Sequence, residues 1–244
     1  MRLDQLILAR GLAASRERAH ALVLGNHVTV NGVPVTKAGT QVDDDAEIQL
    51  KTPDHPWVSR GGLKLARALD VFAIDATGAL ALDIGASTGG FTDVLLHHGA
   101  ARVVAIDVGH NQIDWKLRQD PRVVVREGLN ARYLTPADLP DDARAFDLIT
   151  IDVSFISLAL ILPVIPSLLK PGGRVVALVK PQFEAGRDDV GRGGIVRDPA
   201  IHTRVVADVT RAAAEVGLKR LGLEPSPIEG AEGNREFLLC LALA

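Results

Sequence analysis

From about residue 80 onward, short apolar runs alternate with amphipathic stretches along the chain. Apolar runs bounded by turn residues predict buried strands, and the amphipathic stretches between them predict helices. The run at 175–179 is continuously apolar, as expected for a parallel strand covered on both faces. The pattern predicts an α/β fold, a doubly wound and mostly parallel sheet with an antiparallel last strand, and strands at 80–84, 102–107, 122–126, 147–152, 173–180, 218–224 and 235–243.

The first fifty residues follow a different pattern, two short helical segments and then a hairpin. Asp4 and Ser15 are placed to cap these helices, because a side-chain oxygen there accepts hydrogen bonds from free N–H groups of the first turn. The dipeptide Asn31-Gly32 lies between two apolar runs and accepts the positive φ angles of a tight hairpin turn. The expected helices span 5–10 and 16–24.

Two prolines between positions 52 and 58 indicate a linker after this module. We therefore expect a small α+β domain at 1–51, a linker at 52–58 and a larger α/β domain at 59–244. The larger domain should open with a helix capped by Ser59, and the apolar spacing of that helix leaves Lys64 on another face.

Composition restricts the classes of function. The 244-residue chain has a net charge of −3, so nucleic-acid binding would have to come from local basic patches. The single cysteine, Cys240, excludes a disulfide within the chain and a multi-cysteine zinc site, and the histidines and acids show no metal-ligand spacing. No apolar window approaches the ~20 residues of a membrane span, and no signal peptide is recognised. We expect a soluble cytoplasmic monomer without a metal or a membrane contact.

A glycine-rich turn follows the first predicted strand of the larger domain. In LDIGASTGGFT the strand ends at Asp83 and a helix begins near Phe91, and glycines between them allow backbone N–H groups to approach a ligand. The turn differs from the dinucleotide fingerprint, because Ser87 stands where that motif has a glycine to admit a pyrophosphate. A carboxylate at the strand end repels phosphate and favours an ammonium group.

The next strand also ends in an acid, Asp107, which is placed to accept hydrogen bonds from ribose hydroxyls. Asn130, after the third strand, is placed to bind an adenine edge. A ligand with an amino acid, a ribose and no phosphate is S-adenosylmethionine, although a purely structural βαβ unit would show the same turn. The residues predicted to bind this cofactor are Asp83, Gly85, Ala86, Ser87, Thr88, Gly89, Gly90, Phe91, Asp107, Asn130 and Asp152.

Charged side chains close several of the apolar runs. Asp152 and Lys180 end two predicted strands, Glu236 opens the last one, and Lys64 lies on the first helix of the domain. Because the carboxyl ends of parallel strands share one edge, and an antiparallel last strand brings Glu236 there, these four charges are expected at one rim. A buried charge needs a partner, so structural ion pairs are the alternative to a catalytic set.

Methyl transfer requires a nucleophile aligned with the donor carbon. The segment DVSF after the fourth strand differs from the Asn/Asp-Pro-Pro-Tyr motif of amino-methyltransferases, and no cysteine lies at that edge for covalent attack on a pyrimidine. A ribose hydroxyl remains, and this poor nucleophile benefits from a lysine base.

The stretch RLDQLILARGLAASRERAHALVLGNHVTVNG resembles the S4-type RNA-binding domain. The resemblance implies that its helix pair presents basic residues to an RNA backbone. Such contacts contribute to the affinity and to the orientation of the protein on the RNA more than to recognition of the base sequence. The residues expected to contact RNA are Arg2, Arg10, Arg16 and Arg18 in this domain and Arg60, Arg187 and Arg192 in the larger one.

Lys64, Asp152, Lys180 and Glu236 occur in the order and surroundings of the K-D-K-E tetrad of FtsJ-like ribose 2′-O-methyltransferases. Together with the N-terminal domain, the segments SRGGLKL, DIGASTGGFTD, DVSFISL, KPQFEAGRDDVGRGGIVRDP and GNREF resemble the TlyA family of rRNA methyltransferases, also called hemolysins. The resemblance implies a Rossmann-like methyltransferase sheet and methylation of the 2′-hydroxyl of a cytidine in ribosomal RNA or a ribosomal subunit. It implies that Lys180 is the base, that Asp152 orients it, and that Lys64 and Glu236 hold the ribose. Because the four charges are coupled, the sequence does not show which lysine takes the proton of the hydroxyl group.

Two other functions stay open at this point: a non-catalytic RNA-binding assembly factor and a membrane-lysing hemolysin. The chain shows no span and no strongly amphipathic cationic helix that would favour lysis. The glycine-rich segment 184–198 carries three arginines, and we expect it to be either a flap over the active site that orders on RNA or a disordered loop.

Overall fold

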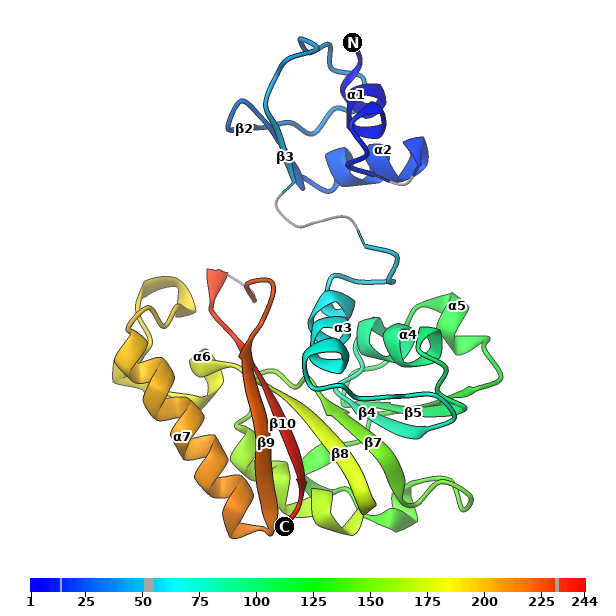
Figure 1. Ribbon diagram of the computed structural model, residues 1–244, viewed down its shortest axis with the longest axis vertical. Helices are drawn as coiled ribbons and strands as arrows, with labels where there is room; N and C mark the ends of the chain where they lie inside the picture. The colour runs from blue at the N-terminus through cyan, green and yellow to red at the C-terminus, as the bar shows by residue number, and fades with distance from the viewer. Residues whose placement is uncertain (14, 51–54, 231–232) are drawn as a thin grey trace. The chain divides into compact units, whose positions relative to one another are not determined.

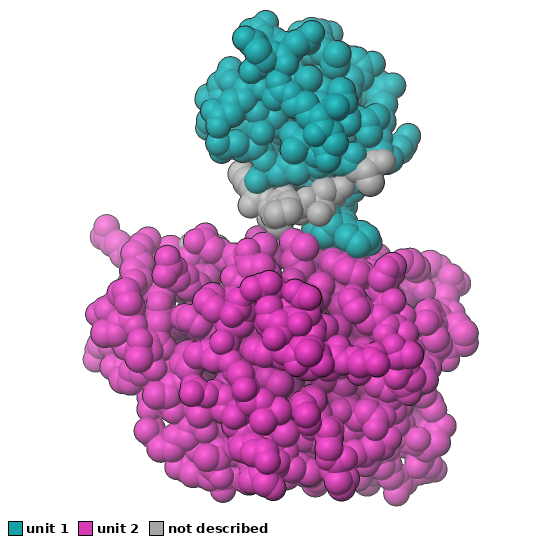
Figure 2. Space-filling view, viewed as in Figure 1, with its two compact units in different colours: residues 1–56 teal, residues 57–244 magenta. Residues whose placement is uncertain are grey.

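The computed structural model describes residues 1–13, 15–50, 55–230 and 233–244. The chain forms two compact units, Met1–Pro56 and Trp57–Ala244 (Figure 2). Part of the predicted linker, 52–54, lies outside the described residues.

The first unit consists of two helices and a small antiparallel sheet with the strand order β2-β1-β3. Apolar side chains of both helices and of β1, among them Leu3, Ile7 and Val28, form its core. Asn31 and Gly32 have φ angles of 50° and 77° between β1 and β2, which confirms the predicted hairpin. The elements are α1 (Leu3–Ala9), α2 (Arg16–Leu24), β1 (Val28–Val30), β2 (Val33–Pro34) and β3 (Ile48–Leu50).

The predicted capping role of Asp4 is wrong, whereas that of Ser15 is confirmed. Ser15 accepts a hydrogen bond from the N–H of Arg18 at the start of α2. Helix α1 begins earlier than predicted, with Arg2 at the N-cap, so Asp4 lies inside the first turn and is buried. Its carboxylate accepts hydrogen bonds from Arg2 and Arg16, and the contact with Arg2 lowers the pKa of Asp4 to about 2.

The second unit is built on a seven-stranded sheet with the order β6-β5-β4-β7-β8-β10-β9, in which only β10 runs antiparallel (Figure 1). This confirms the predicted fold class. Strand β8 begins earlier than predicted, because Leu169 pairs with Phe146 before the register shifts. The strands are β4 (Leu80–Ile84), β5 (Arg102–Asp107), β6 (Val123–Glu127), β7 (Phe146–Ile151), β8 (Leu169–Val179), β9 (Leu218–Pro225) and β10 (Phe237–Leu243).

Helices cover both faces of this sheet. Alternate strand residues point to opposite sides: Ala81 and Val103 pack with α3 and α4, whereas Leu82 and Val104 pack on the side of α7. The predicted cap Ser59 is wrong by one residue, since Arg60 is the N-cap of α3. The helices are α3 (Gly61–Val71), α4 (Gly90–His97), α5 (Trp115–Arg118), α6 (Pro181–Glu184) and α7 (Pro199–Glu215).

The segments on either side of β7 contain only short 3₁₀ helices. Prolines explain this difference from the predicted alternation of strands and helices, because Pro lacks the N–H that an α-helix interior needs. Pro136 opens one 3₁₀ helix and Pro166 lies inside another. These elements are η1 (Ala131–Tyr133) and η2 (Pro136–Asp138) before β7, and η3 (Leu158–Leu160) and η4 (Leu162–Ser167) after it. Two more 3₁₀ helices, η5 (Arg187–Asp189) and η6 (Arg192–Gly194), lie between α6 and α7.

The strand order reverses between β4 and β7. From β4 the chain proceeds to β5 and β6 on one side and then returns to β7 on the other. In open α/β sheets a ligand binds at such a switch point, outside the carboxyl ends of the strands. The antiparallel direction of β10 brings its first residues to the same edge.

Candidate active site

The glycine turn after β4 touches the segment after β7 at the switch point. The N–H groups of Gly85 and Ala86 both donate to the carbonyl of Ile106, at 2.9 and 3.0 Å. Gly85 has a φ of +83°, and a Cβ atom there would lie 2.5 Å from the carbonyl oxygen of Asp152. Only glycine fits this close approach of two backbones.

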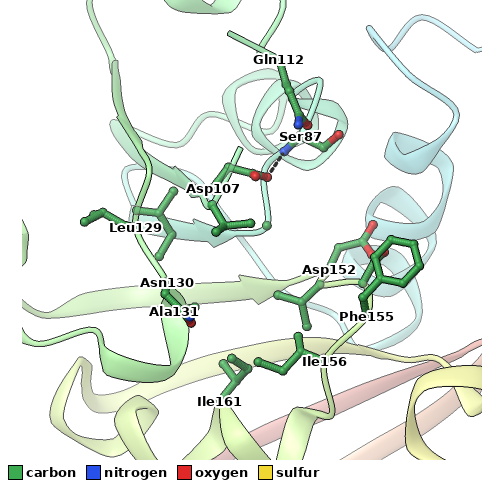
Figure 3. Close-up of a pocket in the computed structure, with 15 residues that line it drawn as sticks. Ser87, Asp107, Gln112, Leu129, Asn130, Ala131, Asp152, Phe155, Ile156 and Ile161 are labelled. Atoms are coloured by element: carbon green, nitrogen blue, oxygen red, sulfur yellow. Dashed lines mark hydrogen bonds between the residues drawn. The ribbon is translucent and has the colours of Figure 1, made fainter. Parts of the chain in front are cut away.

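A cavity of about 420 Å³ lies between the loops that follow β4, β5, β6 and β7 (Figure 3). Its polar side is held by Asp107, which accepts hydrogen bonds from the N–H groups of Ser87 at 2.8 Å and Gly109 at 2.7 Å. Ile156 and Ile161 form part of an apolar wall on the other side. A mostly apolar cavity with a few fixed polar groups suits a nucleoside.

Most residues that the sequence predicted to bind the cofactor line this cavity or a neighbouring one. The first contains Gly85, Ser87, Asp107, Asn130 and Asp152, and the second also contains Ala86, Thr88, Gly90 and Phe91. Gly89 lines neither cavity. It is the N-cap of α4, has a left-handed backbone conformation and packs against α5. The amide oxygen of Asn130 accepts from the N–H of Arg132 and so caps η1.

Asp83 lies beneath the glycine turn and lines neither cavity. Its side chain is 0% exposed, and its two oxygens accept hydrogen bonds from Thr92 at 2.7 Å and Thr150 at 2.9 Å. Burial raises the pKa of Asp83 to about 6, because charge is costly away from water. The expected direct contact with an ammonium group stays a prediction.

The second cavity, of about 180 Å³, shares a wall with the first. Asp152 and Ser154 line both cavities, and Lys180 lines the second. Lys180 Nζ lies 2.6 Å from Asp152 Oδ1 and donates to Ser154 Oγ at 2.9 Å. A basic side chain is thereby fixed on the wall between the two spaces.

The other two predicted charges also form a pair. Lys64 Nζ, on α3, lies 2.5 Å from Glu236 Oε2, and the two residues are 7% and 3% exposed. Phe237 pairs with Val179 in the sheet, so Glu236 and Lys180 come next to each other at its edge. The structure therefore brings the four predicted charges to one rim as two ion pairs.

Four functional candidates near this rim were missed from the sequence: Ser154, Phe155, Phe183 and Glu184. Phe155 has a left-handed φ of +64°, is 90% exposed and lines the larger cavity, with its ring centroid 5.0 Å from that of Phe183. A phenylalanine in an apolar segment is read as core, and no local pattern signals its exposure. Ser154 follows Asp152 closely, and that spacing was the only signal available for it.

The predicted RNA-binding arginines differ in their surroundings. Arg2 and Arg16 are held by Asp4, and Arg10 donates to the carbonyls of Asp44 and Ala46. The remaining candidates in the second unit, Arg60, Arg187 and Arg192, are exposed.

The segment 184–198 has a defined course in the structure. The side chain of Asn234 accepts from the N–H of Val196 at 3.0 Å and donates to the carbonyl of Gly194 at 2.9 Å. His202 Nε2 contacts the carbonyl of Val196 at 2.9 Å. These contacts tie the segment to α7 and to the residues before β10. The expected role as a flap over the active site that orders on RNA stays a prediction.

Within the described ranges, no group of three or more His, Cys, Asp or Glu side chains is arranged to hold a metal ion. Nor does any helix in these parts of the chain have the length and apolar character to cross a membrane.

Comparison with known proteins identifies both units. The FtsJ-like methyltransferase family matches residues 57–243, and the S4 domain matches residues 1–48. The chain is 47% identical over 241 residues to the 16S/23S rRNA (cytidine-2'-O)-methyltransferase TlyA of Mycobacterium tuberculosis, a match that covers 98% of this chain and 89% of that protein. It is 42% identical over 238 residues to hemolysin A of Brachyspira hyodysenteriae, covering 98% of each.

A solved structure of a hemolysin-type protein from Streptococcus thermophilus is similar over 100% of this chain and 88% of that one, with a TM-score of 0.79 and 48% identity. These matches confirm the predicted resemblance: the chain belongs to the FtsJ-like methyltransferase family and carries an S4 domain before its methyltransferase domain.

Proposed function

We propose that this protein transfers a methyl group from S-adenosylmethionine to the ribose 2′-hydroxyl of a cytidine in ribosomal RNA. The observation that carries the proposal is that Lys180, which lines the smaller cavity, contacts Asp152, which lines both cavities. A base in this position reaches a hydroxyl group in the smaller cavity while the larger one holds the donor. The name of the TlyA relative describes the same reaction.

The larger cavity fits an adenosyl group. Asp107 is fixed at its rim by two backbone N–H groups and is placed to bind ribose hydroxyls, and the isoleucine wall accepts a flat base. When bound, S-adenosylmethionine supplies an electrophilic methyl group. Gly85 and Ser87, which line both cavities, would hold the part of the donor nearest Lys180.

Lys180 Nζ, in its neutral amine form, is proposed to accept the proton of the 2′-hydroxyl as the hydroxyl oxygen takes up the methyl group. Asp152 and Ser154 hold this nitrogen through two contacts and so fix its direction, which matters because orientation supplies much of the rate of a displacement. Lys64 and Glu236 are proposed to hold the ribose.

RNA binding is proposed for the S4 domain, taken as residues 1–51 and joined by the linker 52–58 to the catalytic domain. The seven predicted arginines would contact phosphates, with Arg2 and Arg16 oriented by Asp4. We propose a cytoplasmic monomer whose partner is ribosomal RNA or a ribosomal subunit, as the function of the TlyA relative suggests.

The test is methyl transfer from radiolabelled donor to purified ribosomal subunits and free rRNA, followed by ribose-methylation mapping. We expect labelling at one or two cytidines. Lys180→Ala should abolish it and leave donor affinity, measured by calorimetry, within about 3-fold, because Lys180 lines only the smaller cavity. Lys170→Ala is the control, since Lys170 lies on β8, the strand that ends just before Lys180, and pairs with Asp147 outside the site.

Near-normal turnover by Lys180→Ala would overturn the assignment of the base. Wild-type protein that binds rRNA and donor without methylating would identify an assembly factor, and leakage of liposomes on addition of the protein would identify a lytic one.

A further inference from the structure

Two segments at the rim of the sheet are cross-linked by side chains at three places. The first segment, 152–158, follows β7, and the second, 180–184, follows β8 and contains α6. At one end Lys180 contacts Asp152 and Ser154, and in the middle the Phe155 and Phe183 rings are in contact. At the far end the carboxylate of Glu184 binds the first segment again. We refer to these three contacts together as the loop brace.

Glu184 makes the far contact with both of its oxygens. Oε2 accepts from the hydroxyl of Ser157 at 2.6 Å, and Oε1 accepts from the N–H of Leu158 at 2.8 Å. Burial raises the pKa of Glu184, so the carboxylate lies in a place that disfavours its charge. The two hydrogen bonds replace those that water would make to the carboxylate. They also hold the backbone at the start of η3.

The segment that Glu184 holds contains a strained residue. Phe155 has a φ of +64°, a region that a residue with a side chain seldom adopts because it is strained. Such a conformation persists only where the surroundings hold the backbone on both sides. Ser154 precedes Phe155 and is fixed by Lys180, whereas Ser157 follows it and is fixed by Glu184.

The same geometry determines the position of Lys180. Of its two contacts, Asp152 directly follows β7, but Ser154 lies farther into the loop that Glu184 holds. If the far end of this loop moved, Ser154 would leave Lys180 and Phe155 would relax. The nitrogen at the wall between the cavities would then lose one of the two contacts that direct it.

We infer that Glu184 is a positioning residue for methyl transfer, acting through Ser157 and Leu158 to hold Ser154 against Lys180. This inference rests on the proposed function of the site and adds to it a residue that touches neither cavity in the described structure.

The experiment compares Glu184→Ala with Glu184→Gln. The glutamine keeps an acceptor for Leu158 N–H and a polar partner for Ser157, so the brace survives, whereas alanine removes both contacts. We expect the single-turnover rate of methyl transfer to fall about 10- to 100-fold in Glu184→Ala and by less than about 3-fold in Glu184→Gln. Donor affinity should stay within about 3-fold in Glu184→Gln. In Glu184→Ala it should fall by less than the rate, because Glu184 lies outside the larger cavity but holds the loop that carries Phe155 in its wall. Glu215→Ala, at the exposed end of α7, is the control.

Hydrogen exchange provides a readout that needs no activity. Loss of the Glu184 carboxylate should speed exchange in peptides covering 153–158, including the N–H of Leu158, and leave β7 and β8 unchanged. Ser157→Ala removes one of the two contacts of Glu184 and also the hydrogen bond that Ser157 accepts from the N–H of Ala159. It should give an intermediate loss of rate, and it replaces Glu184→Ala in the test if that variant fails to fold.

The inference is overturned if Glu184→Ala methylates at the wild-type rate. It is also overturned if Glu184→Gln is as slow as Glu184→Ala, because the loss of rate would then come from the loss of the negative charge and not from the loss of the hydrogen bonds. Unchanged exchange at 153–158 in Glu184→Ala would also refute the brace. If wild-type protein methylates no rRNA, the proposed function fails, and the exchange result alone then shows whether the brace exists.

Discussion

The buried pair of Lys64 and Glu236 yields the sharpest quantitative prediction. Replacing Lys64 by Met removes the ammonium group but keeps a side chain of similar length on α3. Glu236, 3% exposed, then remains as a buried carboxylate without its partner 2.5 Å away. An uncompensated buried charge of this kind costs about 3–5 kcal/mol.

That cost translates into a measurable change in melting temperature. For a domain of this size, 1 kcal/mol corresponds to about 2–4 °C, so we expect Lys64→Met to lower the Tm by about 6–20 °C. Both tryptophans, Trp57 and Trp115, lie in the unit Trp57–Ala244. Tryptophan fluorescence therefore follows the unfolding of that unit without interference from the S4 domain.

A matched variant and a double variant complete the design. Lys170→Met breaks the pair with Asp147, whose side chains are 40% and 44% exposed, and should cost no more than about 1 kcal/mol. The double variant Lys64→Met/Glu236→Gln removes both charges and should return to within about 2 kcal/mol of the wild type. It should still fail to methylate, because the proposed contacts to ribose are gone.

The reasoning is refuted if Lys64→Met melts within about 2 °C of Lys170→Met, since burial would then have no energetic consequence for this pair. A double variant as unstable as the single one would show that packing, rather than the unpaired charge, sets the cost. Full methyl transfer by the double variant would remove the two residues from the proposed site.

Two further predictions concern Asp83 and Phe155. The pKa of Asp83 is about 6 in the folded protein, against 3.8 for an unperturbed aspartate, so the folded state binds more protons between these values and stability falls as pH rises through this window. This loss of stability amounts to up to about 3 kcal/mol, and Asp83→Asn should abolish it. In urea unfolding, the free energy of unfolding of the variant should then decrease less from pH 4 to 7 than that of the wild type. An equal decrease in both proteins would disprove the prediction. Phe155, exposed beside the Lys180 pair, is placed to stack on a base, which is worth about 1–3 kcal/mol. Phe155→Ala should therefore weaken RNA affinity about 5- to 150-fold in a filter-binding assay. The substitution Trp115→Ala, at another exposed aromatic residue, should not, and equal effects would contradict the idea.

Local pattern in the sequence was sufficient for the strands and for the chemistry at their ends. The run at 175–179 is apolar throughout because both faces of β8 are covered, and Asn31-Gly32 determines a hairpin through backbone preference alone. Since parallel strands end at one edge, the positions of Asp152 and Lys180 at strand ends were enough to predict that they meet. The family resemblance rested on these same segments and is confirmed by the comparisons.

Tertiary structure decided which groups are enclosed and what each one contacts. Asp4 reads as a helix cap, but backbone contacts from Ala38 and Thr40 start α1 earlier and turn the carboxylate toward two arginines. Asp83 ends a strand in the sequence, but only the fold shows that hydroxyl groups from α4 and β7 enclose its carboxyl group.

The pairing of Lys64 with Glu236 and the contacts of Glu184 could not be predicted either. Lys64 and Glu236 are 172 residues apart in the chain, and Glu184 binds a segment 26 and 27 residues before it. Hydrophobic periodicity fixes which residues form a strand or helix, because it depends on neighbours in sequence. Burial, pKa and hydrogen-bond partners depend on neighbours in space, and these exist only once the sheet has formed.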